Sequence, residues 1–333
     1  MKNLSHLQLF LFVLVLGLLA GPKAIDAIQR IYPDTASSQA QVVVAGPQPP
    51  GPGFEPNKTE AGQAEKNAYT DLELEAKSVF VWDIKTHRKL YGVHEYTQLP
   101  LASVAKMMTA IVASLALSED SEITVEPRHL KEEGDSGLLA HEVWKFSDLL
   151  QLTLMASSND GASAIAERAG ALLSKDASSM PSRYTQEFIE QMNAKGAGIG
   201  LLNTHFENES GLDLDLSTSG TYGSARDMAI LFEYIYKKRP EIFLSTAQRS
   251  LSFTSESGVT HQIANTNAAV ERIPGIIGSK TGFTDLAGGN LVVLFDVGID
   301  HPVVIVVLGS TQEGRFTDVE KLVDATIKTI VRQ

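Results

Sequence analysis

The chain has 333 residues, of which 43% are apolar and 20% charged, and its net charge is −12. This composition is typical of a globular protein, and the acidic balance without any Lys/Arg-rich block argues against a nucleic-acid partner. The absence of cysteine excludes thiol nucleophiles, zinc–thiolate sites and disulfides.

The N-terminal region predicts an exported protein. An apolar run, Leu7 to Ala20, follows Lys2; it has the length of a signal-peptide core and is short for a membrane-spanning helix. No A-x-A cleavage site follows it, so residues 1–20 are either a cleaved signal peptide or a retained membrane anchor. Residues 21–75 are rich in Pro, Gly and polar residues and predict a semi-flexible linker. We therefore expect a domain over residues 76–333 outside the cytoplasm, in the cell envelope, anchored through its N-terminus or secreted.

The predicted domain begins with strands and continues with helices. SVFVWD (Ser78–Asp83) and KLYGV (Lys89–Val93), separated by a polar turn, predict a β-hairpin. An apolar helix is expected from Pro100 to Leu117. Four more helices are predicted by their apolar periodicity, over residues 146–156, 161–173, 184–198 and 224–238.

The last third of the chain returns to strands, in LSFTS, IIGSKTG, NLVVLFDVG and PVVIVVLGS. A final amphipathic helix over residues 315–333 is expected to pack on the core, although it could also lie on a membrane surface; its apolar side carries Phe316, Val319, Val323, Ile327 and Ile330. The order of elements predicts a mixed α/β (α+β) fold, with one antiparallel sheet built from both chain ends and an inserted helical region. A cleft between the two halves is a favourable place for a site.

A serine and a lysine share one face at the start of the Pro100–Leu117 helix. Ser103 and Lys106 are three residues apart, in an S-x-x-K pattern. The helix macrodipole disfavours a cation near the N-terminus, and a neutral lysine can remove a serine proton. The pattern is also expected about once by chance in a chain of this length, in which case Lys106 would reach solvent.

Two further patterns follow in the chain. Ser157 and Asn159 form an S-x-N pattern between two helices, where a serine could equally cap a helix. Lys280-Thr281-Gly282 lies near the end of a strand, and its ammonium and hydroxyl groups suit a small carboxylate, with Gly282 leaving room for a ligand backbone. A P-loop is excluded because Ser279, not glycine, precedes the lysine.

These patterns, each present once and in this order, point to one family. From about Ala76 to Gly309 the chain resembles the serine-type D-alanyl-D-alanine carboxypeptidases of the low-molecular-mass penicillin-binding protein family, for which this motif set is known. The blocks PLASVAKMMTA, LMASSNDGASAIAE, NTHFENESGLD, YGSARDMA and GSKTGFTDLAGGNLV also match in order. The resemblance implies a β-lactamase/transpeptidase-like fold.

The resemblance also implies the catalytic roles. Ser103 matches the nucleophile, Lys106 its base and Ser157 the proton relay. The backbone N–H groups of Ser103 and Phe283 would form the oxyanion hole. We expect Lys106 to be held neutral while Lys280 stays charged.

Substrate binding is implied for a second group of residues. Asn159 matches a side chain that orients the substrate, and Lys280 and Thr281 match the residues that bind its terminal carboxylate, next to Gly282. Arg226 could take part in the carboxylate site, but a place on the helix surface is the more economical interpretation. No metal or other cofactor is expected.

The activity implied is removal of the terminal D-alanine from peptidoglycan stem peptides through an acyl-enzyme, with β-lactams as covalent inhibitors. An endopeptidase that cuts D-alanine cross-links would share every motif. A β-lactamase is disfavoured because no E-x-x-x-N spacing occurs between Asn159 and Lys280, and a non-catalytic peptidoglycan-binding module because no motif residue is lost. The second β-domain of many such carboxypeptidases does not follow, so we expect any membrane tether at the N-terminus.

Overall fold

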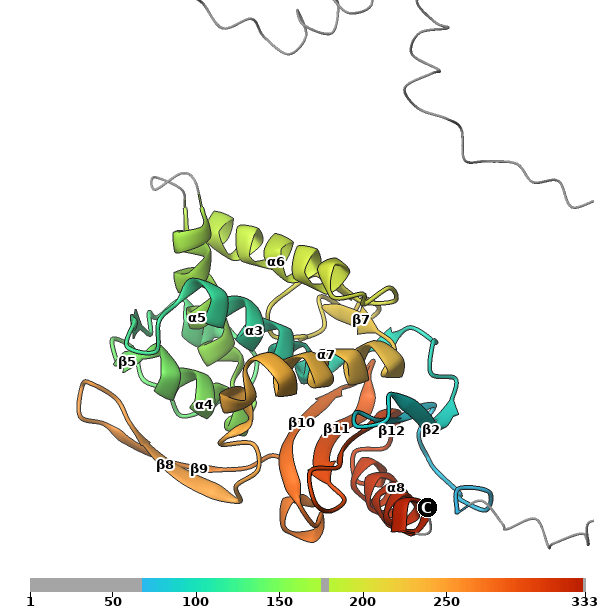
Figure 1. Ribbon diagram of the computed structural model, residues 1–333. Helices are drawn as coiled ribbons and strands as arrows, with labels where there is room; N and C mark the ends of the chain where they lie inside the picture. The colour runs from blue at the N-terminus through green and yellow to red at the C-terminus, as the bar shows by residue number, and fades with distance from the viewer. Residues whose placement is uncertain (1–67, 175–179, 332–333) are drawn as a thin grey trace, which may run out of the picture. The chain divides into compact units, whose positions relative to one another are not determined.

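Strands from both ends of the chain form one five-stranded antiparallel sheet in the computed structural model, which describes residues 68–174 and 180–331 (Figure 1). The strand order is β10-β11-β12-β1-β2, so β1 pairs with β12, with Ser78 opposite Leu308. The predicted sheet is thereby confirmed, except that the predicted strand LSFTS lies outside it, in a separate two-stranded hairpin. Its strands are β1 (Ser78–Asp83), β2 (Arg88–Val93), β10 (Ile276–Thr284), β11 (Gly288–Asp296) and β12 (Pro302–Ser310).

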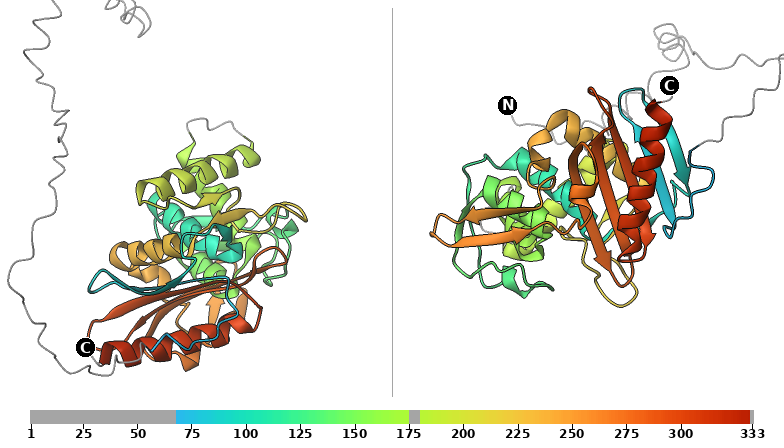
Figure 2. Two further views of the ribbon diagram at one scale, coloured as in Figure 1. Left: turned by 90° about the vertical axis from the view of Figure 1, so that its right-hand side faces the viewer. Right: turned by 90° about the horizontal axis from the view of Figure 1, so that it is seen from below.

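The central strands β11 and β12 are buried on both faces. Val292, Leu294 and Val304 point into the core shared with the helical region, whereas Val293 and Ile305 point to the opposite face. A strand covered on both sides has no polar face, which explains the continuous apolar runs NLVVLF and PVVIVV. Helix α7 (Ala225–Lys238) covers one face, and the last helix, α8 (Gly314–Val331), covers the other (Figure 2).

The inserted region contains four helices: α3 (Lys106–Ala116), α4 (Phe146–Ala156), α5 (Asn159–Leu173) and α6 (Pro181–Gly198). All were predicted, and the differences lie at the helix starts. Helix α5 begins two residues earlier than expected because the Ser158 hydroxyl accepts a hydrogen bond from the backbone of Gly161. Helix α6 begins at Pro181, since proline suits the first turn.

The remaining elements are short connections around these layers. The short strands are β3 (Leu99–Pro100), β4 (Glu122–Thr124), β5 (Val143–Lys145), β6 (His205–Phe206), β7 (Thr221–Gly223), β8 (Ser250–Thr254) and β9 (Thr260–Ala264). The 3₁₀ helices are η1 (Ala102–Ala105), η2 (His129–Lys131), η3 (Pro240–Phe243) and η4 (Val270–Arg272). Strands β8 and β9 form a hairpin beside α4 and β5 (Figure 1).

Helix α8 packs on the sheet, so the prediction that the last helix packs on the core is confirmed. Phe316, Val319 and Val323 are buried, and Ile327 and Ile330 are partly buried against the same cluster. The Tyr69 ring stacks on Tyr91, so the chain already contacts this layer ahead of the domain start expected at Ala76.

The predicted signal peptide or anchor, residues 1–20, and most of the predicted linker lie outside the described residues. Across residues 68–174 and 180–331, no helix is long and apolar enough to cross a membrane.

Candidate active site

The S-x-x-K pair lies where a tight turn enters helix α3. Ser103 is half-buried in η1, and Lys106, the first residue of α3, is completely buried with 0% of its surface exposed. Ala102, just before the serine, has a left-handed backbone with φ of 48°, which is strained for an alanine. The alternative that Lys106 reaches solvent is therefore wrong, and its amine faces the protein interior.

Three oxygen atoms surround the Lys106 amine. Its Nζ lies 2.8 Å from Ser103 Oγ, 2.6 Å from Asn159 Oδ1 and 2.8 Å from the Ser210 carbonyl oxygen. The Asn159 and Ser210 oxygens can only accept hydrogen bonds, and a neutral amine has two N–H groups for them. Its lone pair is then left for the Ser103 hydroxyl, which can donate its proton to it. The geometry suits a neutral lysine acting as a base.

Burial lowers the pKa of Lys106 to about 7, against the opposing effect of the negative charges of Glu209 and Glu132. Removing the ammonium from water disfavours the charged form, and the two carboxyl groups offset part of that penalty. A base that titrates near neutral pH is well matched to proton transfer from a hydroxyl group.

The serine of the S-x-N pattern, Ser157, lies at the end of helix α4. Ser157 adopts a left-handed backbone, with φ of 60°, and Lys280 Nζ donates a hydrogen bond of 2.8 Å to its Oγ. The alternative that Ser157 is a helix N-cap is wrong: the N-cap of α5 is its neighbour Ser158, and Ser157 is the C-cap residue of α4. S-x-N and K-T-G are thus in direct contact, although 123 positions separate Ser157 from Lys280.

The charge expected for Lys280 is not what its surroundings favour. Burial lowers the pKa of Lys280 well below its usual value, and the nearby cations Lys106 and Arg315 lower it further. The structure thus lowers the pKa of both lysines, rather than setting them apart as predicted. An anion beside Lys280 would reverse this effect, since an opposite charge favours the ammonium.

The K-T-G strand touches the turn that carries the nucleophile. A Cβ added to Gly282 would lie 2.6 Å from the Leu101 carbonyl oxygen and 3.2 Å from the Ser103 nitrogen. The glycine therefore makes room for the protein's own turn, whereas the sequence had suggested room for a ligand. Thr281 Oγ1 lies 2.6 Å from Thr266 Oγ1, on the segment that precedes η4.

Asn159 connects Lys106 to the loop that follows η2. Its Oδ1 accepts from Lys106, and its Nδ2 donates to the Glu133 carbonyl oxygen at 2.6 Å. The next residue of α5, Asp160, accepts a hydrogen bond of 3.0 Å from Ser136 in the same loop. The loop is thereby fixed on the side of the site.

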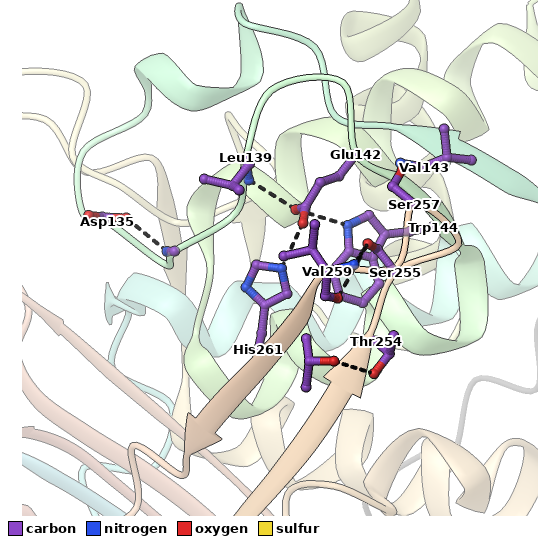
Figure 3. A network of polar contacts seen from close by, with 12 residues as sticks. Asp135, Leu139, Glu142, Val143, Trp144, Thr254, Ser255, Ser257, Val259 and His261 are labelled. Atoms are coloured by element: carbon purple, nitrogen blue, oxygen red, sulfur yellow. Dashed lines mark hydrogen bonds and ion pairs between the residues drawn. The ribbon is translucent and has the colours of Figure 1, made fainter.

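A buried polar network holds the other end of this loop (Figure 3). Glu142 accepts hydrogen bonds from the Leu139 backbone at 2.9 Å and from the Trp144 indole at 3.4 Å. The Nε2 atom of His261, on β9, lies 2.8 Å from Glu142 Oε1. The β8–β9 hairpin therefore supports the loop that contacts Asn159.

A groove with a volume of about 590 Å³ extends from the site. Asn159 lines it from one side and Phe283 from the other, and 44% of the Phe283 surface is exposed. Its other lining residues are mainly leucines and carboxylates: Glu133, Gly134, Leu212, Asp213, Asp215, Leu216, Thr284, Asp285 and Leu286. A peptide could reach the Ser103 region along this groove.

Sequence reasoning missed an arginine behind the K-T-G strand. Arg315, in the first turn of α8, is buried, and its Nη1 donates a hydrogen bond of 2.8 Å to the Gly282 carbonyl oxygen. Arg226 instead lies on α7, where it pairs with Asp227 at 3.7 Å and covers the ring of Tyr96. The sequence does carry a signal for it: Arg315 comes directly before Phe316, the first residue of the apolar stripe of the last helix. The prediction considered only the apolar residues of that helix.

The segment from Asn208 to Leu212, here called the strap, presses against the nucleophile turn. Gly211 has φ of +80°, and a Cβ at this position would collide with the Ala102 carbonyl oxygen. The Asn208 side chain fixes the strap, accepting from the Gly211 backbone at 2.7 Å and donating to the Leu212 carbonyl at 2.9 Å. The strap brings the Ser210 carbonyl to Lys106.

Comparisons with known proteins all lead to D-alanyl-D-alanine peptidases. The profile of the D-alanyl-D-alanine carboxypeptidase family matches residues 63–312. D-alanyl-D-alanine carboxypeptidase DacF of Bacillus subtilis is 29% identical over 262 residues, covering 77% of this chain and 63% of that protein. The D-alanyl-D-alanine endopeptidase of Escherichia coli is 30% identical over 250 residues, or 74% of each chain.

Solved structures share the fold. Penicillin-binding protein D2 from Listeria monocytogenes, in its ampicillin-bound form, is 26% identical, with a TM-score of 0.62 over 77% of this chain and 98% of that chain. The expected transpeptidase-like fold is therefore confirmed.

The strap predicts a stability difference between two glycine variants. Gly211→Ala should cost about 3 kcal/mol or more of unfolding free energy, because backbone strain adds to the collision with Ala102. Gly200→Ala is the matched control, since Gly200 has φ of +84° but nothing within 4 Å of the added Cβ. It should lose only the strain, about 1–2 kcal/mol. Urea unfolding measures both, and equal losses would contradict the contact.

Proposed function

The chain belongs to the D-alanyl-D-alanine carboxypeptidase family, and we propose that it is a serine hydrolase that removes the terminal D-alanine from peptidoglycan stem peptides. One observation carries this proposal. The amine of the fully buried Lys106 lies 2.8 Å from Ser103 Oγ, within reach of its proton. The chain spans 63% of the length of DacF. We therefore propose the carboxypeptidase activity for this chain and do not transfer it from the name of the longer relative.

In the proposed first step, Ser103 Oγ attacks the carbonyl carbon between the two D-alanines, and its proton passes to Lys106 Nζ. The oxyanion then accepts hydrogen bonds from the backbone N–H groups of Ser103 and Phe283. The close approach of Gly282 to the Ser103 nitrogen supports this pairing, because it brings the end of β10 to the nucleophile turn.

Collapse of the tetrahedral intermediate breaks the C–N bond and needs a proton on the leaving amine. Ser157 gives its hydroxyl proton to this amine and is reprotonated through Lys280, whose Nζ lies 2.8 Å from its Oγ. The replacing proton is the one that Lys106 took from Ser103, so Lys106 is neutral again once the acyl-enzyme has formed. The D-alanine departs, and the remaining peptide stays as an ester on Ser103. Water then attacks the carbonyl carbon of the ester and gives a proton to the neutral Lys106, which passes it to Ser103 Oγ as the C–O bond breaks. The shortened peptide leaves as its acid, and the free enzyme is restored.

The carboxylate of the departing D-alanine is proposed to bind at Lys280 and Thr281. Arg315 joins this site from behind the strand, where its guanidinium is buried next to Gly282. An incoming carboxylate would interact with the Arg315 guanidinium and would shift Lys280 towards its charged form, since an opposite charge favours the ammonium. Both polar atoms of the Asn159 amide already have partners in the protein: its Oδ1 accepts from Lys106 and its Nδ2 donates to the Glu133 carbonyl oxygen. We propose that Asn159 keeps its bond to Lys106 and that its Nδ2 leaves the Glu133 carbonyl to donate to the substrate.

Hydrolysis of D-alanine cross-links is the second candidate. The endopeptidase of Escherichia coli matches this chain at an identity similar to that of DacF, and over a larger share of its own length. Both reactions cut a bond after D-alanine through the same acyl-enzyme, so the site chemistry does not separate them. β-lactams are proposed to acylate Ser103 because ampicillin occupies the Listeria protein of the same fold.

Substrate choice is tested with the purified full-length chain. Incubation with a stem pentapeptide should release free D-alanine, whereas a cross-linked dimer should be cut at least about tenfold more slowly if the carboxypeptidase assignment is right. Ser103→Ala should abolish both reactions, with Ser217→Ala, on an exposed loop, as the matched control. Faster cleavage of the dimer would favour the endopeptidase, and activity that survives Ser103→Ala would exclude Ser103 as the nucleophile.

The role of Lys106 predicts a pH dependence. Acylation of Ser103 by a fluorescent penicillin should rise with pH through about 7, because only the neutral amine can accept the serine proton. Lys106→Arg cannot lose its charge and should not be acylated, while circular dichroism confirms that it is folded. Lys131→Arg, at an exposed position, should retain the parent rate. A folded Lys106→Arg variant acylated at the parent rate would show that another group is the base.

The substrate class also implies action outside the cytoplasm, since peptidoglycan stems are processed in the cell envelope. When the full-length chain is produced in a bacterial host, protease added to spheroplasts should degrade the domain and spare a cytoplasmic marker. Protection of the domain under these conditions would contradict the proposed location.

A further inference from the structure

The buried arginine behind the K-T-G strand contacts one particular peptide group. Arg315 Nη1 donates a hydrogen bond of 2.8 Å to the Gly282 carbonyl oxygen, and only 7% of the Arg315 surface is exposed. The carbon of that carbonyl group is bonded to the nitrogen of Phe283, whose N–H is the second donor of the proposed oxyanion hole. Arg315 therefore lies at one end of the peptide group whose other end would stabilise the oxyanion.

The geometry of strand β10 sets the direction of this peptide group. Along an extended strand, successive carbonyl groups point to opposite sides. The Thr281 carbonyl accepts a hydrogen bond of 3.0 Å from Lys280 Nζ and so points towards the site. The Gly282 carbonyl, one residue further on, points the other way, to Arg315. Since the N–H of a trans peptide group lies opposite its carbonyl, the Phe283 N–H points back towards the site.

The start of helix α8 holds the arginine in place. The Arg315 backbone nitrogen donates to the Thr311 carbonyl oxygen at 3.2 Å, and the Gly314 nitrogen donates to Thr311 Oγ1 at 2.9 Å. The guanidinium carbon lies 4.7 Å from the centre of the Phe316 ring, a favourable cation–π contact. These contacts keep the guanidinium against β10 without the help of a ligand.

Stability alone does not favour an arginine at this position. Burial lowers the pKa of Arg315, and its Nε is buried without a hydrogen-bond partner among the described residues. A buried charge and a buried donor without a partner both lower the free energy of unfolding. In return, the cation makes a charge-assisted hydrogen bond to one carbonyl group. Such a bond polarises the peptide group and makes its N–H a stronger donor.

We propose that Arg315 is a positioning residue that fixes and polarises the Gly282–Phe283 peptide group, so that the Phe283 N–H is aimed at the oxyanion, an inference that rests on the proposed acyl-enzyme function. In this role Arg315 does not touch the oxyanion and acts only through the peptide group. A guanidinium has five N–H donors, so the bond to Gly282 leaves others for the substrate carboxylate.

Two thioesters of N-acetyl-D-alanine separate this role from carboxylate binding. The thioester with thioglycolate has a carboxylate in its leaving group, and the thioester with ethanethiol has none. Thiol release by the purified full-length chain is measured for both, and the protein contributes no thiol because it has no cysteine. Arg315→Met should lower kcat about 10- to 100-fold for both, since loss of a whole oxyanion donor costs about 10²–10³. A role in carboxylate binding alone would raise KM for the thioglycolate thioester only.

Arg272→Met is the matched control. Arg272 also donates a hydrogen bond of 2.8 Å to a backbone carbonyl, that of Ala268, and it pairs with Glu320 of α8, but 54% of its side chain is exposed. This variant should retain the parent rates. If circular dichroism shows that Arg315→Met is unfolded, Arg315→Lys replaces it; one ammonium in place of the planar fork should lower kcat for both thioesters by a smaller factor. Parent rates with the ethanethiol thioester in a folded Arg315 variant would overturn the proposal.

The peptide group can also be observed without catalysis. Glycine labelled with ¹³C at the carbonyl and phenylalanine labelled with ¹⁵N select the Gly-Phe peptide groups by NMR, and the sequence has two, Gly53-Phe54 and Gly282-Phe283. Phe283→Leu identifies the second by removing its signal. In Arg315→Met this signal should move upfield in both ¹³C and ¹H, because the carbonyl loses its charged donor and the N–H is less polarised. Arg272→Met should leave it in place.

The outcomes separate the two proposals. An unchanged Gly282–Phe283 signal in folded Arg315→Met would overturn the role of Arg315, even if penicillin still labels Ser103. A signal that moves as expected, in a chain that neither the thioesters nor penicillin acylate, would support the polarised peptide group and contradict the proposed function instead.

Discussion

The complete burial of one lysine is the constraint on which the site depends. Lys106 opens helix α3 with its amine inside the protein, so α5, the strap and η1 must each supply an oxygen to it. Each of these oxygens depends on a local feature of the chain. The strap needs a left-handed glycine at position 211, the turn before Ser103 needs a left-handed Ala102, and α5 must begin with an asparagine. These local costs are tolerated because a buried ionisable group without partners would be more unfavourable.

The edge of the sheet supplies the second half of the site. Among residues 68–174 and 180–331, strand β10 is an edge strand of the sheet, and it lies against η1 at Gly282. Lys280 and Arg315 are buried at this edge with their charged forms disfavoured by burial. Lys106 supplies a base next to the nucleophile, and Lys280 and Arg315 form a buried pocket whose charged forms an anion would stabilise. This arrangement suits a reaction in which an anionic group binds beside a nucleophile. The two halves meet where η1 contacts β10, at the junction of the helical region and the sheet.

Prediction from the sequence succeeded where one physical signal dominates. The helix Phe146–Ala156 and the strand Pro302–Ser310 were located to the residue, because their apolar patterns are long and uninterrupted. Helix starts were less accurate, since Ser158 and Pro181 decide them through local capping and proline geometry. The proposed site residues Ser103, Lys106, Ser157 and Lys280 could be proposed from the sequence because motif order is a property of the chain itself. In the structure their side chains form two contacting pairs, Ser103 with Lys106 and Ser157 with Lys280.

The sequence by itself determined the motif residues, the layer order and the family. Only the tertiary structure decided how the motifs meet: that Ser157 contacts Lys280, that Arg315 lies behind Gly282, and that the Ser210 carbonyl reaches Lys106. These relations join positions up to more than a hundred residues apart, and charge interactions depend on distance and burial, which no local pattern encodes. For the same reason, the shared lowering of the two lysine pKa values could not be read from their spacing.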